Sequence, residues 1–237
     1  MSLLEVKGIS KHFGGVAALR NVDVQMTSGE TLGMIGPNGS GKTTFVNIVT
    51  GHLVPDSGQL LFNEGSIAGT APHRLAALGL TRTYQAVRVF GGLSVGKNIE
   101  AAMLLGLPGA PESAERNELV HWLRLDHRLA SLAGSLTLFE QRRLELLMRL
   151  LQRPQLIMLD EPVGGLAVTE VREMIALLHE LKARCSIFVI EHTMRVIREL
   201  ADRVVVLMAG EKIADGPPAD ILRDRRVVEQ YLGTTHA

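Results

Sequence analysis

A nine-residue glycine-rich stretch, Gly36 to Thr44, constrains the fold of this chain more than any other feature. The strand-like run Thr31–Ile35 precedes it, and a helical pattern follows over Gly41–Gly51. A strand, a glycine-rich loop ending in lysine and threonine, and a helix are together typical of a loop that wraps a phosphate group. Gly39 and Gly41 would let backbone N–H groups approach the phosphates, because a Cβ atom would block them. The motif therefore predicts an α/β fold with a phosphate-binding loop.

The lysine and the first threonine of this loop carry specific expectations. Lys42 is expected to reach the β and γ phosphates of a nucleotide, and Thr43 to ligate Mg²⁺. The helix N-terminus would add N–H donors and the positive end of the helix dipole. A plain glycine-rich turn before a helix is the alternative, and the agreement of all five features argues against it. The residues expected around the phosphates are Asn38, Gly39, Ser40, Gly41, Lys42, Thr43 and Thr44.

A second motif is an apolar run that ends in two carboxylates. Leu156–Leu159 are followed directly by Asp160 and Glu161. This pattern predicts a buried strand with acids at its C-terminal end, where α/β sheets bind ligands. Asp160 is expected to hold Mg²⁺, and Glu161 to polarise an attacking water. A strand that ends in a helix-capping acid is the alternative, which the nearby phosphate-binding loop disfavours.

Composition narrows the functional classes further. The chain has 237 residues, of which 46% are hydrophobic, and its formal net charge is zero. The apolar fraction suffices for a packed core, and the zero net charge gives no electrostatic support for nucleic-acid binding. One cysteine, Cys185, cannot form an internal disulfide. No signal peptide is expected, and no run approaches the roughly 18 apolar residues of a membrane span, so any membrane role would be peripheral.

Strands and helices are expected to alternate along most of the chain, which is typical of a buried and mostly parallel sheet. From Ser94 to Leu151 the pattern is helical, with a loop at Gly106–Pro111. After Glu211 it predicts a short strand, a turn at Pro217-Pro218 and two short helices. The other predicted strands and helices are Leu3–Val6, Gln59–Phe62, Ser186–Ile190 and Val204–Met208, then Val168–Ala183 and His192–Asp202.

The order of the motifs resembles the ATP-binding subunits of ABC transporters. The phosphate-binding loop is followed by Gln85, then by Asp160 and Glu161, and then by His192. The resemblance covers essentially the whole chain. It implies an α/β P-loop NTPase (RecA-like) ABC ATPase core with an N-terminal antiparallel β portion and an α-helical subdomain. The single domain 1–237 would divide into a core, 1–84 and 152–237, and a helical subdomain, 85–151.

The resemblance also implies a role for each matching residue. Glu161 would orient the attacking water, His192 would contact the γ-phosphate, and Gln85 would touch Mg²⁺ and sense a membrane partner. Phe13 would stack on adenine, and Val16 of the same motif would also contact ATP. Taken alone, each residue has a plainer interpretation: Gln85 as a surface amide, Phe13 as a core side chain and His192 as a helix cap. The implied cofactors are ATP and Mg²⁺, the catalytic set is Glu161, His192 and Lys42, and Mg²⁺ would be held through Thr43, Gln85 and Asp160.

Shorter motifs narrow the subfamily. They look like the ATPases of branched-chain amino acid importers, while urea and amide importer ATPases share most of them. Lipopolysaccharide-export ATPases are similar at the C-terminus. The motifs are Phe13-Gly14-Gly15-Val16, Arg82-Thr83-Tyr84-Gln85, Val87–Phe90, Gln141–Glu145, Ile190–Met194 and Tyr231-Leu232-Gly233.

The sequence departs from the family at its signature motif, which binds the ATP held by a second subunit. Thr137 keeps the hydroxyl of the family pattern, but Phe139 replaces a glycine. We expect its ring to obstruct the approach of backbone donors to the γ-phosphate, and losing one such donor costs roughly 10²–10³ in rate. A second departure is Ala167, where the family often has aspartate. The aligned signature residues are Leu136, Thr137, Leu138, Phe139 and Glu140.

The expected function is ATP binding and hydrolysis that energises a membrane importer, with the chain as one half of an asymmetric ATPase heterodimer. The implied partners are permease subunits, a second ABC ATPase and a solute-binding protein, without nucleic acid. The implied location is the cytoplasmic face of the inner (plasma) membrane, with the isolated chain soluble. The alternatives are a nucleotide-gated binding module with little turnover, the ATPase of a lipopolysaccharide-type exporter, and a soluble ABC ATPase acting on nucleic acid or ribosomes. Against the last, the chain has one neutral cassette and no basic insertion.

Overall fold

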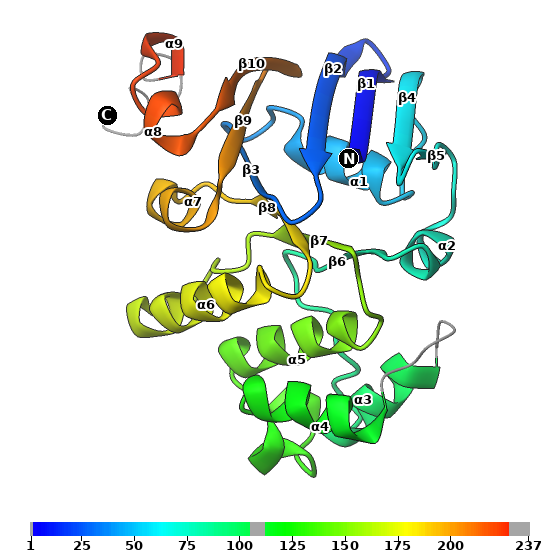
Figure 1. Cartoon of the computed structure of the whole chain (residues 1–237), viewed down its shortest axis with the longest axis vertical. Helices are drawn as coiled ribbons and strands as arrows, with labels where there is room; N and C mark the ends of the chain where they lie inside the picture. The colour runs from blue at the N-terminus through cyan, green and yellow to red at the C-terminus, as the bar shows by residue number, and fades with distance from the viewer. Residues whose placement is uncertain (1, 105–111, 228–237) are drawn as a thin grey trace.

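Two β-sheets and a layer of helices make up the described part of the chain, residues 2–104 and 112–227 of a computed structural model (Figure 1). The predicted loop Gly106–Pro111 and the motif Tyr231–Gly233 lie outside the described residues. The predicted α/β fold, with an antiparallel N-terminal portion and a helical part, is confirmed.

The larger sheet has the strand order β10-β9-β3-β8-β7-β6. Its strands pair in parallel except for β9 with β10, which are antiparallel. Parallel neighbours place the C-terminal ends of β3, β7 and β8 at one edge of the sheet, where the phosphate-binding loop also begins. The strands are β3 (Thr31–Ile35), β6 (Leu80–Arg82), β7 (Leu156–Asp160), β8 (Ser186–Ile190), β9 (Arg203–Met208) and β10 (Glu211–Gly216).

Side chains of the larger sheet enter two different hydrophobic cores, one on each face. Leu156 and Met158 of β7 join the core that lies toward the smaller sheet, whereas Ile157 and Leu159 join the core on the opposite face. Successive side chains of a strand point to opposite faces, so a strand covered on both sides must be apolar throughout. This explains why β7 and β8 appear in the sequence as continuous apolar runs.

The smaller sheet is antiparallel, with the order β2-β1-β4-β5. Its first strand runs well beyond the predicted Leu3–Val6, and β2 was not predicted at all. The signal for β2 is the alternation of buried Leu19, Val22, Val24 and Met26 with exposed polar residues. The strands are β1 (Ser2–Phe13), β2 (Val16–Thr27), β4 (Ser57–Phe62) and β5 (Gly65–Ser66).

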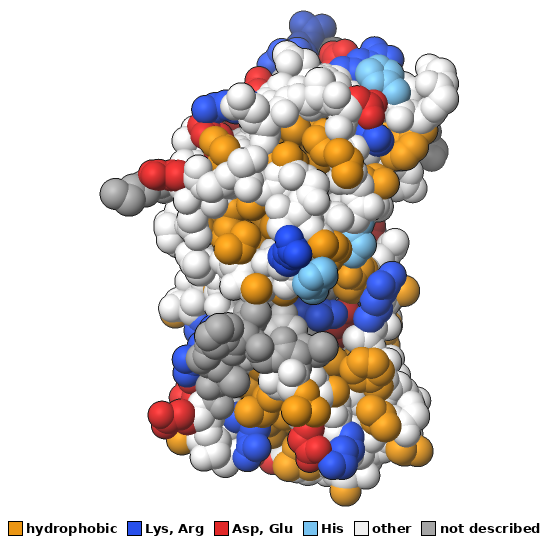
Figure 2. Space-filling model, turned by 90° about the vertical axis from the view of Figure 1, so that its right-hand side faces the viewer, with side chains coloured by type: hydrophobic (Ala, Val, Ile, Leu, Met, Phe, Trp, Pro, Cys, Tyr) orange, Lys and Arg blue, Asp and Glu red, His pale blue; other side chains and the backbone are white. Residues whose placement is uncertain are grey.

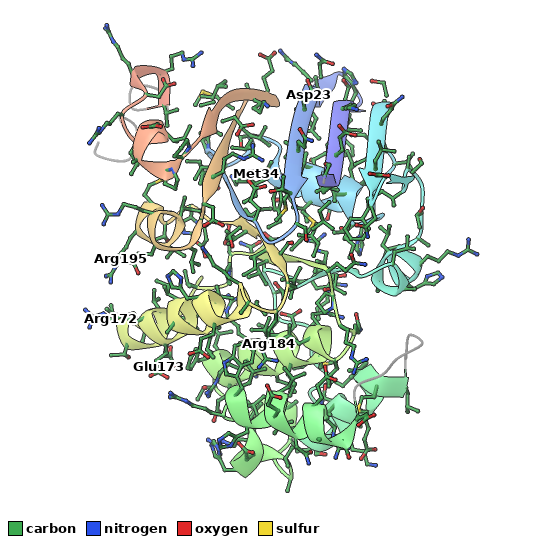
Figure 3. All side chains as sticks on the ribbon, viewed as in Figure 1. Asp23, Met34, Arg172, Glu173, Arg184 and Arg195 are labelled. Carbon is green, nitrogen blue, oxygen red and sulfur yellow. The ribbon has the colours of Figure 1, made fainter. Side chains whose placement is uncertain are left out.

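Helices cover both faces of the larger sheet (Figure 1). The helix α1 shares one hydrophobic core with both sheets, whereas α5, α6 and α7 contribute to the core on the opposite face. Figure 3 shows Arg172 and Glu173 pointing outward from α6, while Met34 lies inside the molecule. The helices are α1 (Lys42–Val49), α2 (Pro72–Ala77), α3 (Val95–Leu104), α4 (Ser113–Trp122), α5 (Leu138–Leu150), α6 (Val168–Leu181), α7 (Met194–Leu200), α8 (Pro218–Ile221) and α9 (Arg225–Val227), with 3₁₀ turns η1 (Asp126–Arg128) and η2 (Ala133–Ser135).

Candidate nucleotide-binding site

The phosphate-binding loop joins the end of β3 to the start of α1, as the sequence predicted. Gly41 caps α1 at φ +106°, a conformation that favours glycine. A Cβ atom at Gly41 would lie 2.5 Å from the carbonyl oxygen of Ala18, and one at Gly36 would lie 2.1 Å from that of Leu207. The glycines are therefore required by close backbone contacts with β2 and β9 as well as by any bound phosphate.

Lys42 lies across this loop. Its Nζ atom donates hydrogen bonds to the carbonyl oxygens of Gly36, at 2.7 Å, and Pro37, at 3.0 Å. Burial lowers the pKa of Lys42, and the nearby carboxylates of Glu161 and Asp160 oppose that shift. Its charge therefore sits where phosphates would bind, at the first turn of α1 with its free N–H groups.

Two hydroxyl side chains of the loop fit an anionic ligand. Ser40 Oγ is buried and has no hydrogen-bond partner within residues 2–104 and 112–227. A buried hydroxyl without a partner carries a free-energy cost that a bound oxyanion would remove. Thr43 is exposed in the first turn of α1, as are Asn38 and Gly39 in the preceding loop. These residues are therefore accessible to a nucleotide.

Glu161 is the point at which three predicted site residues meet. Gln85 Nε2 donates a hydrogen bond of 2.9 Å to Glu161 Oε2, and His192 Nδ1 lies 3.6 Å from Glu161 Oε1. Glu161 follows β7 directly and has φ +49°, which is uncommon for a residue with a Cβ atom. Strained backbone of this kind clusters at functional sites. The structure thus brings Gln85 and His192 to the two oxygens of one carboxylate.

Asp160 forms a buried ion pair with Arg82, a partner that was not predicted from the sequence. Arg82 Nη2 lies 3.0 Å from Asp160 Oδ2, and both side chains are buried. Burial raises the pKa of Asp160, and the charge of Arg82 opposes that shift. Arg82 also donates to Asn47 Oδ1 of α1 at 2.7 Å, so the pair links β6, β7 and α1. The available signal was an arginine at the end of an apolar strand-like run, where burial forces a charged partner.

Phe13 and Val16 flank the turn between β1 and β2, and both are exposed. The ammonium group of Lys11 lies 5.8 Å from the centre of the Phe13 ring. Two residues beyond Val16, the carbonyl of Ala18 lies against Gly41 of the phosphate-binding loop. The hairpin therefore adjoins that loop, and an exposed aromatic face is available to a planar base.

The predicted obstruction by Phe139 is wrong for this structure. The Phe139 side chain is only 6% exposed, and it packs in the core of the helical layer with the guanidinium of Arg143 4.4 Å from its ring centre. Phe139 lies in the first turn of α5, on the face of that helix that packs into this core. Leu138, 40% exposed, stands at the surface instead, beside Gly165.

The remaining signature residues form the start of α5. Thr137 Oγ1 accepts a hydrogen bond from the Glu140 amide at 3.2 Å, and the Thr137 amide donates to Glu140 Oε2 at 2.9 Å. This reciprocal capping box occupies two of the N–H groups at the helix start. Leu136 is buried, and Glu140 also pairs with Arg128 at 2.7 Å. The start of α5 is therefore well formed, and two N–H groups there already donate to side chains of the same segment.

A fully buried carboxylate, Glu191, also lies at this edge and was not predicted as a site residue. It follows the apolar strand β8 as Asp160 ends β7, and its side chain is 0% exposed. The sequence signal, an acid at the end of an apolar run, was the same as for Asp160. Its Oε1 atom accepts a hydrogen bond from the Val163 amide at 3.2 Å.

Two features are absent from residues 2–104 and 112–227. No group of three or more His, Cys, Asp or Glu side chains is arranged to hold a metal ion by itself. Within the same residues, no helix has both the length and the apolar character needed to cross a bilayer.

Comparisons with known proteins agree with this geometry. Residues 19–164 match the family described as ABC transporter, and residues 211–237 match the one described as branched-chain amino acid ATP-binding cassette transporter. The chain is 34% identical to the high-affinity branched-chain amino acid transport ATP-binding protein BraF of Pseudomonas aeruginosa, over 98% of each chain. It is also 34% identical to the lipopolysaccharide export system ATP-binding protein LptB of Acidithiobacillus ferridurans, over 98% of this chain and 97% of that one. The ADP conformation of MJ1267, a solved ATP-binding cassette, superposes with a TM-score of 0.87 and 30% identity, over 98% of this chain and 99% of that chain.

Proposed function

Because this chain belongs to the ABC transporter ATP-binding subunits, in the branched-chain amino acid transporter family, we propose that its ATP hydrolysis energises an importer of branched-chain amino acids or of a related small polar solute such as urea or an amide. The location implied by this function is the cytoplasmic face of the inner (plasma) membrane, bound peripherally to a permease. A core of 1–84 and 152–237 with a helical subdomain of 85–151 is part of the same proposal.

The observation that carries the proposal is the convergence of Gln85 and His192 on the carboxylate of Glu161, at 2.9 Å and 3.6 Å. Glu161 would orient and polarise the attacking water, His192 would contact the γ-phosphate, and Lys42 would offset charge on the transferred group. Phosphoryl transfer needs positioning and charge neutralisation more than covalent chemistry, and these residues would supply both.

Mg²⁺ fits the donor set of the site. Thr43, Gln85 and Asp160 would offer a hydroxyl, an amide oxygen and a carboxylate, all oxygen ligands of the kind that Mg²⁺ prefers, with Asp160 also paired to Arg82 through Oδ2. Mg²⁺ usually binds through one or two carboxylates together with substrate phosphates, so it needs no dedicated cluster of acids. The ion would neutralise phosphate charge, while Phe13 and Val16 would hold the adenine end.

The signature motif supports an asymmetric pair of ATPases. The capping box of Thr137 and Glu140 occupies donors that a phosphate from a second subunit would otherwise accept from, and exposed Leu138 adds apolar bulk at the same place. In a heterodimer the site of this chain, completed by a sister subunit, would hydrolyse ATP faster than the sister's site. The alternative favoured by the same observation is a nucleotide-gated binding module with little turnover.

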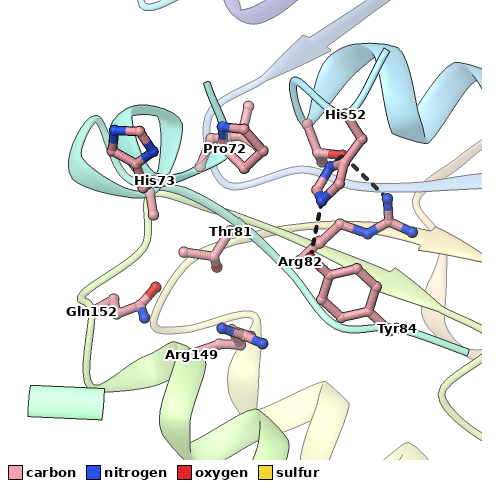
Figure 4. Close-up of a pocket in the computed structure, with 11 residues that line it drawn as sticks. His52, Pro72, His73, Thr81, Arg82, Tyr84, Arg149 and Gln152 are labelled. Atoms are coloured by element: carbon pink, nitrogen blue, oxygen red, sulfur yellow. Dashed lines mark hydrogen bonds between the residues drawn. The ribbon is translucent and has the colours of Figure 1, made fainter. Parts of the chain in front are cut away.

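A cavity of about 250 Å³, lined in part by Tyr84, the residue before Gln85, supports a permease contact (Figure 4). It lies between α2, β6 and the end of α5, and Figure 2 shows basic and histidine side chains gathered at mid-height on this face. Arg82 and Arg88 stack on the Tyr84 ring, 4.6 Å and 3.9 Å from its centre. Because Arg82 is paired with Asp160, the positive charge here comes from Arg149 in the lining and from Arg88 next to Tyr84, and it fits a permease segment that presents carboxylates or the carbonyls of a helix C-terminus. The lining includes His52, His73, Arg82, Tyr84, Arg149 and Gln152.

The test is a pull-down of the tagged chain from detergent-solubilised membranes of the source cell, with ATPase assays on the recovered complex. We expect permease subunits and a second, different ATPase, and we expect Glu161→Gln to bind ATP while stopping turnover at this chain's own site. Equal hydrolysis at both sites would contradict the asymmetry. Recovery without membrane subunits would favour the binding module, and recovery with an exporter permease would favour the lipopolysaccharide-type alternative.

A further inference from the structure

The backbone turn that carries Glu161 is held in an uncommon conformation. Glu161 has φ +49°, in the left-handed region that costs a residue with a Cβ atom of order 1 kcal/mol or more. Such a conformation persists only when the surrounding contacts over-determine it. The turn closes on itself through one internal bond, in which the Gly164 amide donates to the Glu161 carbonyl oxygen at 3.0 Å. One bond of this kind does not by itself fix the direction of the Glu161 side chain.

Three further hydrogen bonds attach the backbone of this turn to other parts of the fold. The Glu161 amide donates to the carbonyl oxygen of Ile190 at 2.9 Å, which is the last ladder-type contact with β8. The Val163 amide donates to Glu191 Oε1 at 3.2 Å. Arg142 Nη2 donates to the Gly164 carbonyl oxygen at 2.6 Å. Two of the three attachments are thus made by charged side chains.

Those two side chains are costly to keep in the interior. Glu191 is 0% exposed and Arg142 8% exposed. Glu191 Oε2 and Arg142 Nε are buried without a hydrogen-bond partner among the described residues. Burial raises the pKa of the Glu191 carboxyl, and it lowers the pKa of Arg142 against the opposing charges of nearby acids, Glu191 and Glu161 among them. A buried charged side chain with an unpartnered polar atom contributes little net stability, so the positions of these two side chains call for another role.

We propose that Glu191 and Arg142 are positioning residues for Glu161, holding the 161–164 turn through the Val163 amide and the Gly164 carbonyl so that the Glu161 carboxylate meets Gln85 and His192. Glu191 directly precedes His192, and Arg142 lies on α5 just after the signature residues. The turn is therefore tied to the segment that carries His192 and to the helix that begins at the signature. This inference rests on the proposed role of Glu161 in orienting water.

The test compares Glu191→Ala, Glu191→Gln and Thr31→Val in the co-purified transporter complex. Removing the acceptor in Glu191→Ala should lower kcat about 10²-fold with the KM for ATP within about twofold of wild type, because misplacement of about 1 Å costs that much. Glu191→Gln keeps an oxygen acceptor and should stay within about threefold of wild type. Thr31→Val removes a buried hydroxyl at the start of β3 that has no hydrogen-bond partner among the described residues, and it should change neither parameter.

Hydrogen exchange of the full chain supplies a readout that does not depend on activity. Peptides covering residues 161–166 should exchange faster in Glu191→Ala than in wild type, because the Val163 amide loses its acceptor. Glu191→Leu, which is close in volume and lacks the acceptor, replaces the alanine variant if that one fails to assemble.

The outcomes distinguish the proposed role of Glu161 from the proposed positioning role of Glu191. If Glu161→Gln leaves turnover unchanged, the proposed role of Glu161 fails. If Glu161→Gln stops turnover but neither Glu191→Ala nor Glu191→Leu lowers kcat, the positioning role is refuted. A rise in KM equal to the fall in kcat, or a loss in Glu191→Gln as large as that in Glu191→Ala, would also refute it.

Discussion

Replacing Phe139 by glycine would restore the residue type that the sequence comparison with the ABC family leads one to expect at this position. If the ring stood at the surface, this change would have little effect on folding. In the structure the ring is 6% exposed and packs in the core of the helical layer, where Arg143 lies over its face. The substitution therefore tests which environment the ring occupies.

The expected cost follows from these contacts. Truncating a buried phenylalanine to alanine costs about 3–5 kcal/mol, through lost transfer free energy and the cavity left behind. Glycine instead of alanine within a helix adds roughly 0.5–1 kcal/mol. We therefore expect Phe139→Gly to lower the free energy of unfolding by about 3.5–6 kcal/mol. Phe139→Leu, which keeps most of the volume, should cost less than about 1.5 kcal/mol.

The assay is urea-induced unfolding of the purified full chain without nucleotide, followed by far-ultraviolet circular dichroism. The free energy of unfolding is compared between wild type, Phe139→Leu and Phe139→Gly at equal m-values. A loss of no more than about 1 kcal/mol in Phe139→Gly would match the glycine penalty alone. That result would refute the buried placement of the ring and return Phe139 to the surface that meets a second subunit.

Two other substitutions test buried charges. Burial raises the pKa of Glu145 to about 7 from 4.5. The folded state therefore holds this proton more tightly than the unfolded state does. Stability is lost as the pH rises from 4.5 through about 7. Between pH 4.5 and 8, wild type should lose about 3 kcal/mol more than Glu145→Gln in urea unfolding, and parallel pH profiles would contradict this. Arg82→Met leaves the Asp160 carboxylate buried without its cation. It should lower the free energy of unfolding by about 3–5 kcal/mol at pH 7. A loss below about 1 kcal/mol would show that water replaces the guanidinium.

Local patterns in the sequence were sufficient for the phosphate-binding loop and the acids after β7. Glycine spacing, a lysine and threonine at the loop end, and apolar runs of strand length describe conformations of neighbouring residues. Such signals depend on residues that are close in the sequence, so they can be recognised without knowing how distant segments pack. The same pattern, an acid at the end of an apolar run, also marked Glu191, but nothing in the sequence distinguished a residue that would hold a turn from one that would meet a ligand.

Contacts between distant segments decided the rest. Arg82 and Asp160 pair across 78 positions of the chain, and Arg142 of α5 reaches Gly164 in the turn after β7, so the partner of each buried charge depends on how the elements pack. The inward direction of Phe139 is set in the same way, by where α5 lies against its neighbours. The sequence by itself determined which chemical groups the site contains. Only the tertiary structure decided which of them are buried, what they bond to and which way they face, because those properties are set by packing between elements.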